Sequence, residues 1–312
     1  MEIVPFSNDL FKQRSNLLQQ SLRPNCNSYP IESEYPIVLS KDNPQFSYCV
    51  TESDRKFSPP KLVAHANFWP RMMFEKSTQV EYPIALVGNV ATDLKYRGCG
   101  VMKNLLESLW RRATQSSFHA LILWSDLHQF YQKLGFTACG YEHRICFSHQ
   151  KLQNFTGDFK FVVPASESFG EDVVNEMLRL RVSTPFSLKR SSKEFMELLK
   201  IPDTIVLMSY QDQELNAYVI LGKGNDMIGV VHEWGASKPE IILAALKHIV
   251  LATRWQHIWL LAPVNIGNIW MKAFQPYTHC LETHPLALAK CKEGSPIRKV
   301  IENGFIWGLD SI

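Results

Sequence analysis

Hydrophobic and polar residues alternate along the first half of the chain with two periods, one typical of strands and one typical of helices. Short apolar or alternating runs predict strands at residues 37–40, 46–51, 62–74, 83–90, 120–124 and 139–147. Apolar residues three and four positions apart predict helices at residues 11–22 and 101–115. A short helix around Tyr131 is expected after the strand at 120–124, with Gly135 ending it in the left-handed conformation. This order predicts an α/β (α+β) domain.

The second half of the chain repeats the pattern more weakly. Helices are expected at residues 173–181, 192–200 and 239–253, and strands at residues 204–210, 216–222, 227–234 and 257–262. Residues 223–226 have the composition of a hairpin turn between two of these strands. Residues 148–158 are polar and have no periodicity. We therefore expect two domains, at residues 1–149 and 161–312, joined by a linker at residues 150–160.

The composition of the chain excludes several classes of protein and of binding partner. The 312 residues are 46% hydrophobic and 20% charged, as in folded proteins with a sizeable core. A net charge of +3 is too small to indicate nucleic acid or an anionic membrane surface as a partner. The seven cysteines include no C-x-x-C pair and the histidines no H-E-x-x-H, so we expect no metal site and no disulfide framework. Without a signal-like N-terminus or an apolar run of membrane length, the chain is expected to be cytoplasmic.

The turn between the strand at 83–90 and the helix at 101–115 carries the most chemical information. It reads Tyr96-Arg97-Gly98-Cys99-Gly100. Glycines allow positive φ and close approach of a ligand, and the first N–H groups of the following helix have no partner within the helix. Such a turn binds anions, and a diphosphate is its natural ligand. Lys103 stands where a dinucleotide fingerprint needs glycine, and no Gly-Lys-Ser/Thr of a P-loop is present.

This turn resembles the acyl-CoA loop of the GNAT superfamily of N-acetyltransferases, Arg/Gln-x-x-Gly-x-Gly/Ala. Arg97 and Gly100 fill the first and fourth positions, whereas Met102 replaces the small sixth residue. The sequence F-Y-Q-K-L-G-F at residues 130–136 is similar to a second motif of that family. The resemblance implies the GNAT fold, a mixed and largely antiparallel sheet flanked by helices, duplicated here as two domains. The second copy lacks the Arg-x-x-Gly-x-Gly turn and is therefore expected to be degenerate.

The resemblance also implies a reaction, the transfer of an acetyl group from acetyl-CoA to an amine. Backbone groups of residues 90–92 would hold the pantetheine arm and polarise the thioester carbonyl. Tyr131 would be the general acid that protonates the departing thiolate. The residues expected to bind acetyl-CoA are Val90, Ala91, Thr92, Arg97, Gly98, Cys99, Gly100, Val101 and Met102.

The general base and the acceptor are not specified by either motif. His65 and Glu233 are the catalytic candidates, although His65 equally fits a half-buried sheet residue and Glu233 a salt bridge. Asn67, Glu75 and Asp93 are further candidates. The acceptor is expected to carry an amine and to be a small molecule, a peptide or a protein lysine, and the oligomeric state stays open. Two alternatives are a non-catalytic acyl-CoA-binding or interaction module and a transferase for a longer acyl or aminoacyl group.

Overall fold

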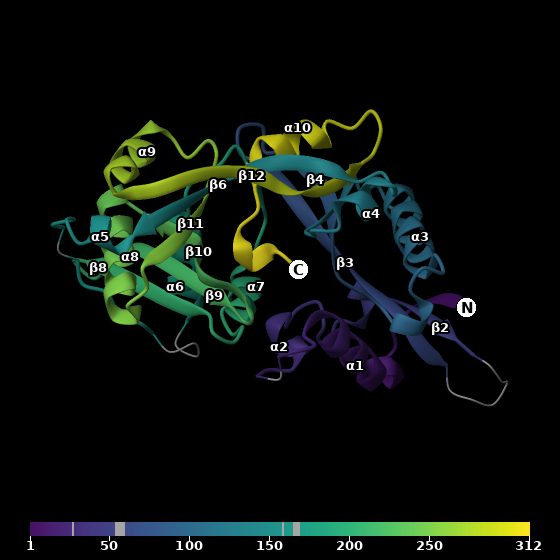
Figure 1. Cartoon of the computed structure of the whole chain (residues 1–312). Helices are drawn as coiled ribbons and strands as arrows, with labels where there is room; N and C mark the ends of the chain where they lie inside the picture. The colour runs from purple at the N-terminus through teal and green to yellow at the C-terminus, as the bar shows by residue number, and fades with distance from the viewer. Residues whose placement is uncertain (27, 54–59, 158, 165–168) are drawn as a thin grey trace. The chain divides into compact units, whose positions relative to one another are not determined.

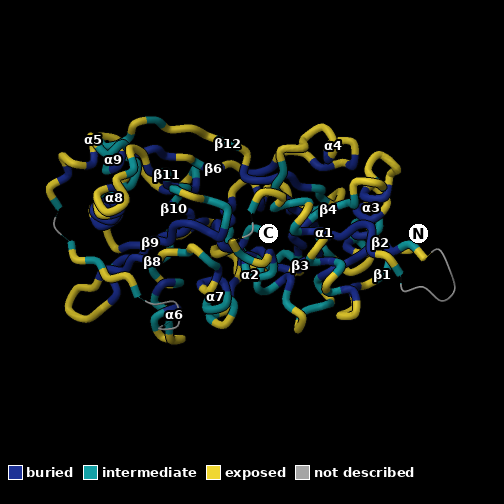
Figure 2. The backbone as a smooth tube through the Cα atoms, turned by 60° about the horizontal axis from the view of Figure 1, so that its bottom comes forward, coloured by how far each residue is buried: buried dark blue, intermediate teal, exposed yellow. Residues whose placement is uncertain are grey.

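The computed structural model describes residues 1–26, 28–53, 60–157, 159–164 and 169–312. The chain divides into two compact units, each built from segments that are not contiguous in sequence (Figure 1). Unit 1 comprises residues 1–139, 287–302 and 311–312, and unit 2 comprises residues 140–286 and 303–310. In both units the central strands are mostly buried, whereas loops and outer helix faces are exposed (Figure 2).

Unit 1 is built on a mostly antiparallel sheet with one parallel pairing, between β4 and β5. Its first four strands pair in the order β1, β2, β3 and β4, each antiparallel to the next. Their bounds are Glu2–Pro5, Ser47–Glu52, Lys61–Glu75 and Glu81–Thr92. Strand β5 (Ala120–Leu123) runs parallel to β4 but pairs with it only at Ala85 and Leu86. The end of β12 (Thr278–Cys291) pairs antiparallel with β5.

Helices cover this sheet and complete its core. They are α1 (Phe11–Leu22), α2 (Ile31–Glu34), α3 (Val101–Gln115), α4 (His128–Gln132) and α10 (Ile297–Glu302). Short 3-10 turns are η1 (Asn8–Leu10), η2 (Pro44–Phe46) and η3 (Leu94–Tyr96). The apolar face of α3, including Leu105, Leu106 and Leu109, is buried in one hydrophobic core with residues of β2 to β5. Helix α1 packs on β3 and β4.

In unit 2, β6 (Thr137–Ser148) pairs antiparallel with β11 (His257–Pro263), and β11 pairs parallel with β10 (Asp226–Ala236). Strands β9 (Glu214–Lys223) and β8 (Ile205–Gln211) continue the sheet antiparallel. A short parallel pair joins β7 (Phe186–Leu188) to β13 (Gly304–Phe305). The helices are α5 (His149–Leu152), α6 (Glu171–Leu180), α7 (Ser192–Leu198), α8 (Pro239–Thr253) and α9 (Asn268–Phe274). Further 3-10 turns are η5 (Gln275–Tyr277) and η6 (Gly308–Asp310).

Most elements predicted from periodicity are present, and the α/β class is confirmed. The helices at 11–22, 101–115 and 239–253 have the predicted bounds. The predicted strand at 37–40 is wrong, because residues 36–39 form a turn. Val38 and Leu39 are buried there, and their carbonyl oxygens accept hydrogen bonds from the side chains of Asn67 and Arg14 instead of from a neighbouring strand. Within the described part of the chain, no helix combines the length and the apolar character that crossing a membrane requires.

The expected linear division at residues 150–160 does not coincide with the two units. Residues 149–152 form helix α5, capped by the Ser148 side chain, and Asp158 lies outside the described residues. Both β6 and β12 contribute residues to both units. The last five residues of β12, 287–291, belong to unit 1 although they lie far beyond residue 149, and four of them pair with β5. No periodicity in the sequence had indicated this 14-residue strand.

Candidate active site

The loop between β4 and α3 has the backbone that its glycines allow. After η3, Gly98 has φ +78° and Gly100 has φ +76°, and Gly100 is the N-cap of α3. A Cβ atom at either position would meet no atom within 4 Å, so space does not require glycine there. The left-handed conformation requires it instead, because L side chains are strained at these φ values. The predicted turn is therefore present.

The start of α3 offers backbone donors. The N–H of Asn104 bonds to the carbonyl oxygen of Gly100 at 3.0 Å, so the preceding residues Val101, Met102 and Lys103 begin the helix without intrahelical partners for their N–H groups. The helix dipole adds partial positive charge at this end. The side chains of Val101 and Met102 are buried in the core. Met102 therefore replaces the small residue of the family motif without standing out into solvent.

A cavity of about 660 Å³ lies against this loop, and all of its lining residues belong to unit 1. The lining residues are Ser21, Leu22, Val90, Ala91, Thr92, Tyr96, Arg97, Gly98, Gly100, Val101, Met102, Lys103, Leu127, Phe130 and Tyr131. The cavity thus brings together the two stretches that resemble the GNAT motifs. Of the residues expected to bind acetyl-CoA, only Cys99 is outside the lining, and its side chain is exposed.

A β-bulge shapes the strand beside this cavity. His65 pairs with Ala91 and Asn67 pairs with Gly88, so β4 has one residue more than β3 between these pairs. Asn89 lies in the bulge with φ +48°, and its side-chain amide donates to Asn67 Oδ1 at 2.9 Å. A β-bulge is therefore present at Asn89. Because a bulge interrupts the ladder, it frees main-chain groups near Val90, which lines the cavity.

Tyr131 also lines this cavity. Its ring contacts Phe130 and Phe136 edge-to-face, with centroid distances of 5.0 and 5.7 Å. The side chain is buried, and burial raises the pKa of its hydroxyl to about 12, an effect that a hydrogen bond with Ser125 partly opposes. The phenol is therefore protonated at neutral pH. Gly135, at φ +85°, ends this segment in the left-handed conformation, as predicted.

His65 and Glu233, the two candidates for the base, are outside this cavity lining. His65 is fully buried in β3, and its Nδ1 donates to the carbonyl oxygen of Asn89 at 2.9 Å. Burial lowers the pKa of His65 to about 3, which leaves little basicity. Glu233 belongs to unit 2, where its two carboxylate oxygens accept hydrogen bonds from Arg190 at 2.7 and 2.9 Å. Both side chains are therefore better explained as structural residues.

The other three candidates for the base also have partners. The amide nitrogen of Asn67 donates to the carbonyl oxygens of Val38 and Phe46. Glu75 accepts a hydrogen bond from Thr78 at 2.7 Å. Asp93 caps η3 by accepting from the N–H of Lys95 and forms an ion pair with Lys61 at 2.9 Å. Among the described residues, no group of three or more His, Cys, Asp or Glu side chains has an arrangement that could hold a metal ion.

Two parts of this region were not found by sequence reasoning. Ser21 and Leu22, at the end of α1, line the cavity although they lie 68 positions or more before Val90 in the chain. The main-chain carbon and oxygen of Ile312 lie only 2.5 Å from where a Cβ on Gly88 would be. Glycine at position 88 is thus required by the close approach of Ile312 to the bulge. No local pattern could have indicated either contact, because both join distant parts of the chain.

Comparison with known proteins agrees with this geometry. Residues 56–139 match the family model described as an acetyltransferase (GNAT) domain. Similar solved structures include a GCN5-related N-acetyltransferase from Kribbella flavida (TM-score 0.64, 14% identity, 92% of this chain and 70% of that chain covered). A probable N-acyltransferase from Enterococcus faecalis has a TM-score of 0.67 at 14% identity, with 93% and 72% covered. N-myristoyltransferase of Saccharomyces cerevisiae, solved with bound myristoyl-CoA, has a TM-score of 0.55 at 12% identity, with 93% and 79% covered. Among curated protein sequences none matches.

Proposed function

The chain carries a GNAT acetyltransferase domain and has the GNAT fold, and on that premise we propose that it is an N-acetyltransferase that uses acetyl-CoA. One observation carries the proposal. The start of α3, with its free backbone N–H groups, and Tyr131 line a single cavity. Acyl transfer from coenzyme A needs donors for the diphosphate at one end of the pantetheine arm and an acid for the sulfur at the other. The acceptor is a primary amine on a small molecule or a peptide.

In this proposal the diphosphate of acetyl-CoA is held by the N–H groups at the start of α3 and by Arg97. Arg97 is exposed at the rim, and its Nε donates to the carbonyl oxygen of Thr92 at 3.2 Å, which directs the side chain along the loop. The pantetheine arm then extends along residues 90–92 towards Tyr131. The main-chain N–H groups beside the bulge are the donors for the thioester oxygen, because the bulge withdraws them from the β3–β4 ladder.

The reaction is a direct transfer. The amine nitrogen, as the free base, attacks the thioester carbonyl carbon, the C–N bond forms, and the carbonyl oxygen becomes an oxyanion held by backbone N–H groups. The C–S bond then breaks, Tyr131 donates its hydroxyl proton to the sulfur, and the proton that the attacking nitrogen loses returns through solvent to the Tyr131 phenolate. A phenol with a pKa of about 12 stays protonated throughout the physiological pH range, so Tyr131 is always in the donating form.

Unit 2 has a supporting role in this proposal and binds no coenzyme A. We place the protein in the cytoplasm, since all seven cysteines are free thiols in the structure.

The test of the proposed mechanism is Tyr131→Phe, which keeps the ring contacts with Phe130 and Phe136 and removes only the hydroxyl. We expect kcat for amine acetylation to fall about 100-fold, the lower end of the usual contribution of acid catalysis, with unchanged affinity for acetyl-CoA. Release of CoA thiol measures the rate, and calorimetry measures the affinity. Tyr141→Phe, which alters an exposed tyrosine, is the matched control. Undiminished turnover by Tyr131→Phe would remove Tyr131 as the acid.

A second candidate function is a non-catalytic acyl-CoA-binding module. It is favoured by one observation: the described lining of the cavity contains no carboxylate and no imidazole that could serve as a base. The two functions differ in a single-turnover experiment with excess protein and a panel of primary amines. Binding of acetyl-CoA without transfer to any amine supports the module, whereas appearance of an acetylated amine supports the transferase.

A further inference from the structure

Two pairs of cysteines are in contact although their members lie far apart in the sequence. Cys139 and Cys291 share a hydrogen bond between their thiols, and so do Cys146 and Cys280. Each pair joins β6 to β12, which are neighbours in the order of strands. The first pair belongs to unit 1 and the second to unit 2. All four residues are free thiols in the structure, so an oxidant can join either pair.

Neighbouring contacts fix the register of the pair in unit 2. His143 Nδ1 and Thr283 Oγ1 are 3.1 Å apart across the two strands. Cys146 lies three residues further along β6, and Cys280 three residues back along β12, so the strands run antiparallel here and the two cysteines are opposed. Opposed residues of antiparallel strands have Cα atoms about 4.5–5.5 Å apart, within the range of about 4.4–6.8 Å that disulfides span.

The pair in unit 1 has one thiol suited to react first and one suited to follow. Cys139 is buried and its Sγ lies 3.9 Å from the carbonyl oxygen of Arg298, whereas Cys291 is partly exposed. The hydrogen bond with Cys139 lowers the pKa of the Cys291 thiol. Arg298 adds to this effect, whereas burial and the charge of Glu302 oppose it. Because the thiolate is the species that oxidants attack, Cys291 is the more reactive thiol of the pair.

The pair in unit 2 has a less reactive environment. Burial raises the pKa of Cys146 to about 11, and the neighbouring Cys280 and the carboxylate of Glu282 act in the same direction. The two pairs thus share the contact between thiols and differ in the ease with which a thiolate forms. The pair in unit 2 is therefore an internal control for the pair in unit 1.

We propose that Cys139 and Cys291 form a reversible disulfide site that hydrogen peroxide oxidises. The Cys291 thiolate attacks one peroxide oxygen, the O–O bond breaks, and the hydroxide that leaves takes up a proton to become water. Cys291 is then a sulfenic acid. The Cys139 sulfur attacks the Cys291 sulfur, the S–S bond forms, and the S–O bond breaks to release a second water. In sum, two thiols and one hydrogen peroxide give one disulfide and two waters, and a dithiol reverses the change by exchange.

The site lies beside both ends of the segment that carries Tyr131. Cys291 pairs with Ala120, the first residue of β5. Cys139 follows Phe136, whose ring packs against that of Tyr131, by three residues. Residues 120–139 therefore begin and end next to the two sulfur atoms. Closing the disulfide adds a covalent restraint directly after the segment that carries Tyr131.

The test exposes the reduced, whole protein to hydrogen peroxide at neutral pH, blocks the remaining thiols with iodoacetamide and identifies linked peptides by mass spectrometry. In monomeric wild-type protein we expect a peptide that joins Cys139 to Cys291 and that dithiothreitol removes. We expect free Cys291 to disappear about tenfold faster than free Cys280, because more of it is thiolate.

Three variants assign the roles of the two thiols. In Cys139→Ala the second step is blocked, so dimedone should trap a sulfenic acid at Cys291. Cys291→Ala should abolish the rapid loss of two thiols. Cys280→Ala is the matched control, because it removes one thiol of the other pair and should leave the linked peptide and its rate unchanged.

The measurement on wild-type protein decides the proposal even if a variant fails to fold. Loss of free thiols without a Cys139–Cys291 peptide overturns it, and so does a Cys146–Cys280 peptide that forms as fast. A sulfinic acid at Cys291 without the linked peptide overturns it as well, because Cys139 would then not reach the sulfenic acid. Neither acetyl-CoA nor an amine takes part in this test, so its outcome is independent of the proposed function.

Discussion

Each unit contains a strand followed directly in the chain by a helix, but the two connections differ in the backbone N–H groups that they leave free. In unit 1, eight residues separate β4 from α3, and two of them are glycines with positive φ. In unit 2, only Ser237 and Lys238 separate β10 from α8, and the helix begins with Pro239. A proline at the first helical position has no N–H to offer, and the N–H of Ser237 is bonded to the carbonyl oxygen of Asn216 at 3.0 Å. The connection in unit 1 leaves backbone N–H groups free at the start of α3, whereas the connection in unit 2 leaves almost none at the start of α8.

The strands that precede these connections also match and then diverge. Both carry a bulge, at Asn89 in β4 and at His232 in β10. A buried histidine lies at each bulge: His65 of β3 donates to the carbonyl oxygen of Asn89, and His232 itself donates to the carbonyl oxygen of Gly222 in β9. Beside the β4 bulge is the cavity. Beside the β10 bulge, Glu233 and Asp310 both bind Arg190, and Gly308 packs directly against His232. A bulged strand followed by a helix can therefore border either a cavity or a filled core. The length of the connecting loop and the buried charged side chains beside the bulge decide which of the two forms.

The largest expected effect comes from breaking the ion cluster of unit 2. Arg190 is fully buried, and although burial acts to lower the pKa of its guanidinium, the charges of Asp310 and Glu233 raise it above its ordinary value. Arg190→Met removes the cation that both buried carboxylates bind, and Glu233 keeps only the longer ion pair with Arg181 at 3.8 Å among those that the structure describes. We expect the free energy of unfolding to fall by about 3–5 kcal/mol in urea denaturation.

Arg179→Met is the control for this substitution, because it removes an arginine from the exposed ion pair with Glu176. It is expected to change stability little, since exposed pairs contribute little. If Arg190→Met were as stable as wild type, the cluster would not be structural, and the contrast between the two units would have to be given up.

An intermediate effect is expected from pH, because each unit buries one neutral histidine. Burial lowers the pKa of both His65 and His232 to about 3, whereas an unfolded histidine titrates near 6.5. The unfolded chain therefore binds more protons between these values. The stability contributed by each histidine is fully present above pH 6.5 and is lost as the pH falls towards 3. Between pH 7.5 and pH 5 each is expected to remove about 2 kcal/mol.

Urea denaturation at several pH values measures this slope, in wild type and in the variants His65→Gln and His232→Gln. Each variant should be less sensitive to pH than wild type, and by a similar amount. His128→Gln, at an exposed histidine, controls for the loss of an imidazole. If only one of the two variants changed the pH dependence of the free energy of unfolding, the two bulges would not be equivalent.

The smallest expected effect concerns the loop itself. Gly100→Ala places a Cβ in the left-handed conformation at a cost of about 1 kcal/mol and turns the first N–H groups of α3 away from their ligand. We expect KM for acetyl-CoA to rise about fivefold, measured with a saturating amine. Gly294→Ala is the matched control, since Gly294 also has positive φ (+72°) with open space around it but lies outside the cavity. It should lose similar stability and keep its KM.

The sequence by itself determined the local features of this protein. The helical period of residues 101–115 gave the bounds of α3, and the two glycines gave the positive φ of the loop, because both depend on neighbours within a few residues. The second motif located Tyr131, and the structure brings it to the same cavity as the loop. The absence of the glycine turn after residue 234 likewise predicted that the second half has no such loop.

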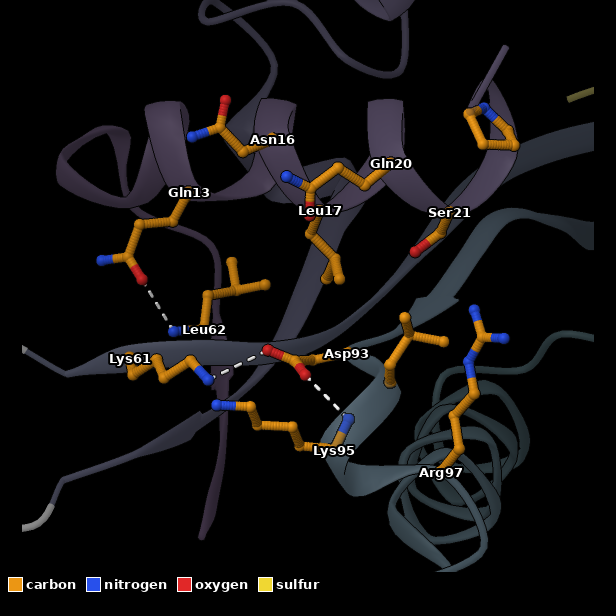
Figure 3. A pocket seen from close by; sticks show the side chains of 12 residues that line it. Gln13, Asn16, Leu17, Gln20, Ser21, Lys61, Leu62, Asp93, Lys95 and Arg97 are labelled. Carbon is orange, nitrogen blue, oxygen red and sulfur yellow. Dashed lines mark hydrogen bonds and ion pairs between the residues drawn. The ribbon is translucent and has the colours of Figure 1, made fainter.

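Only the tertiary structure decided which residues meet across long separations. The pairing of β12 with β5, the approach of Ile312 to Gly88 and a cavity of about 550 Å³ between α1 and Asp93 (Figure 3) each join segments that no local period relates. The same holds for His65 and Glu233, whose burial and partners made them structural. A residue's basicity depends on its solvation and on the charges around it, and these are set by parts of the chain that fold against it rather than by the residues beside it in the sequence.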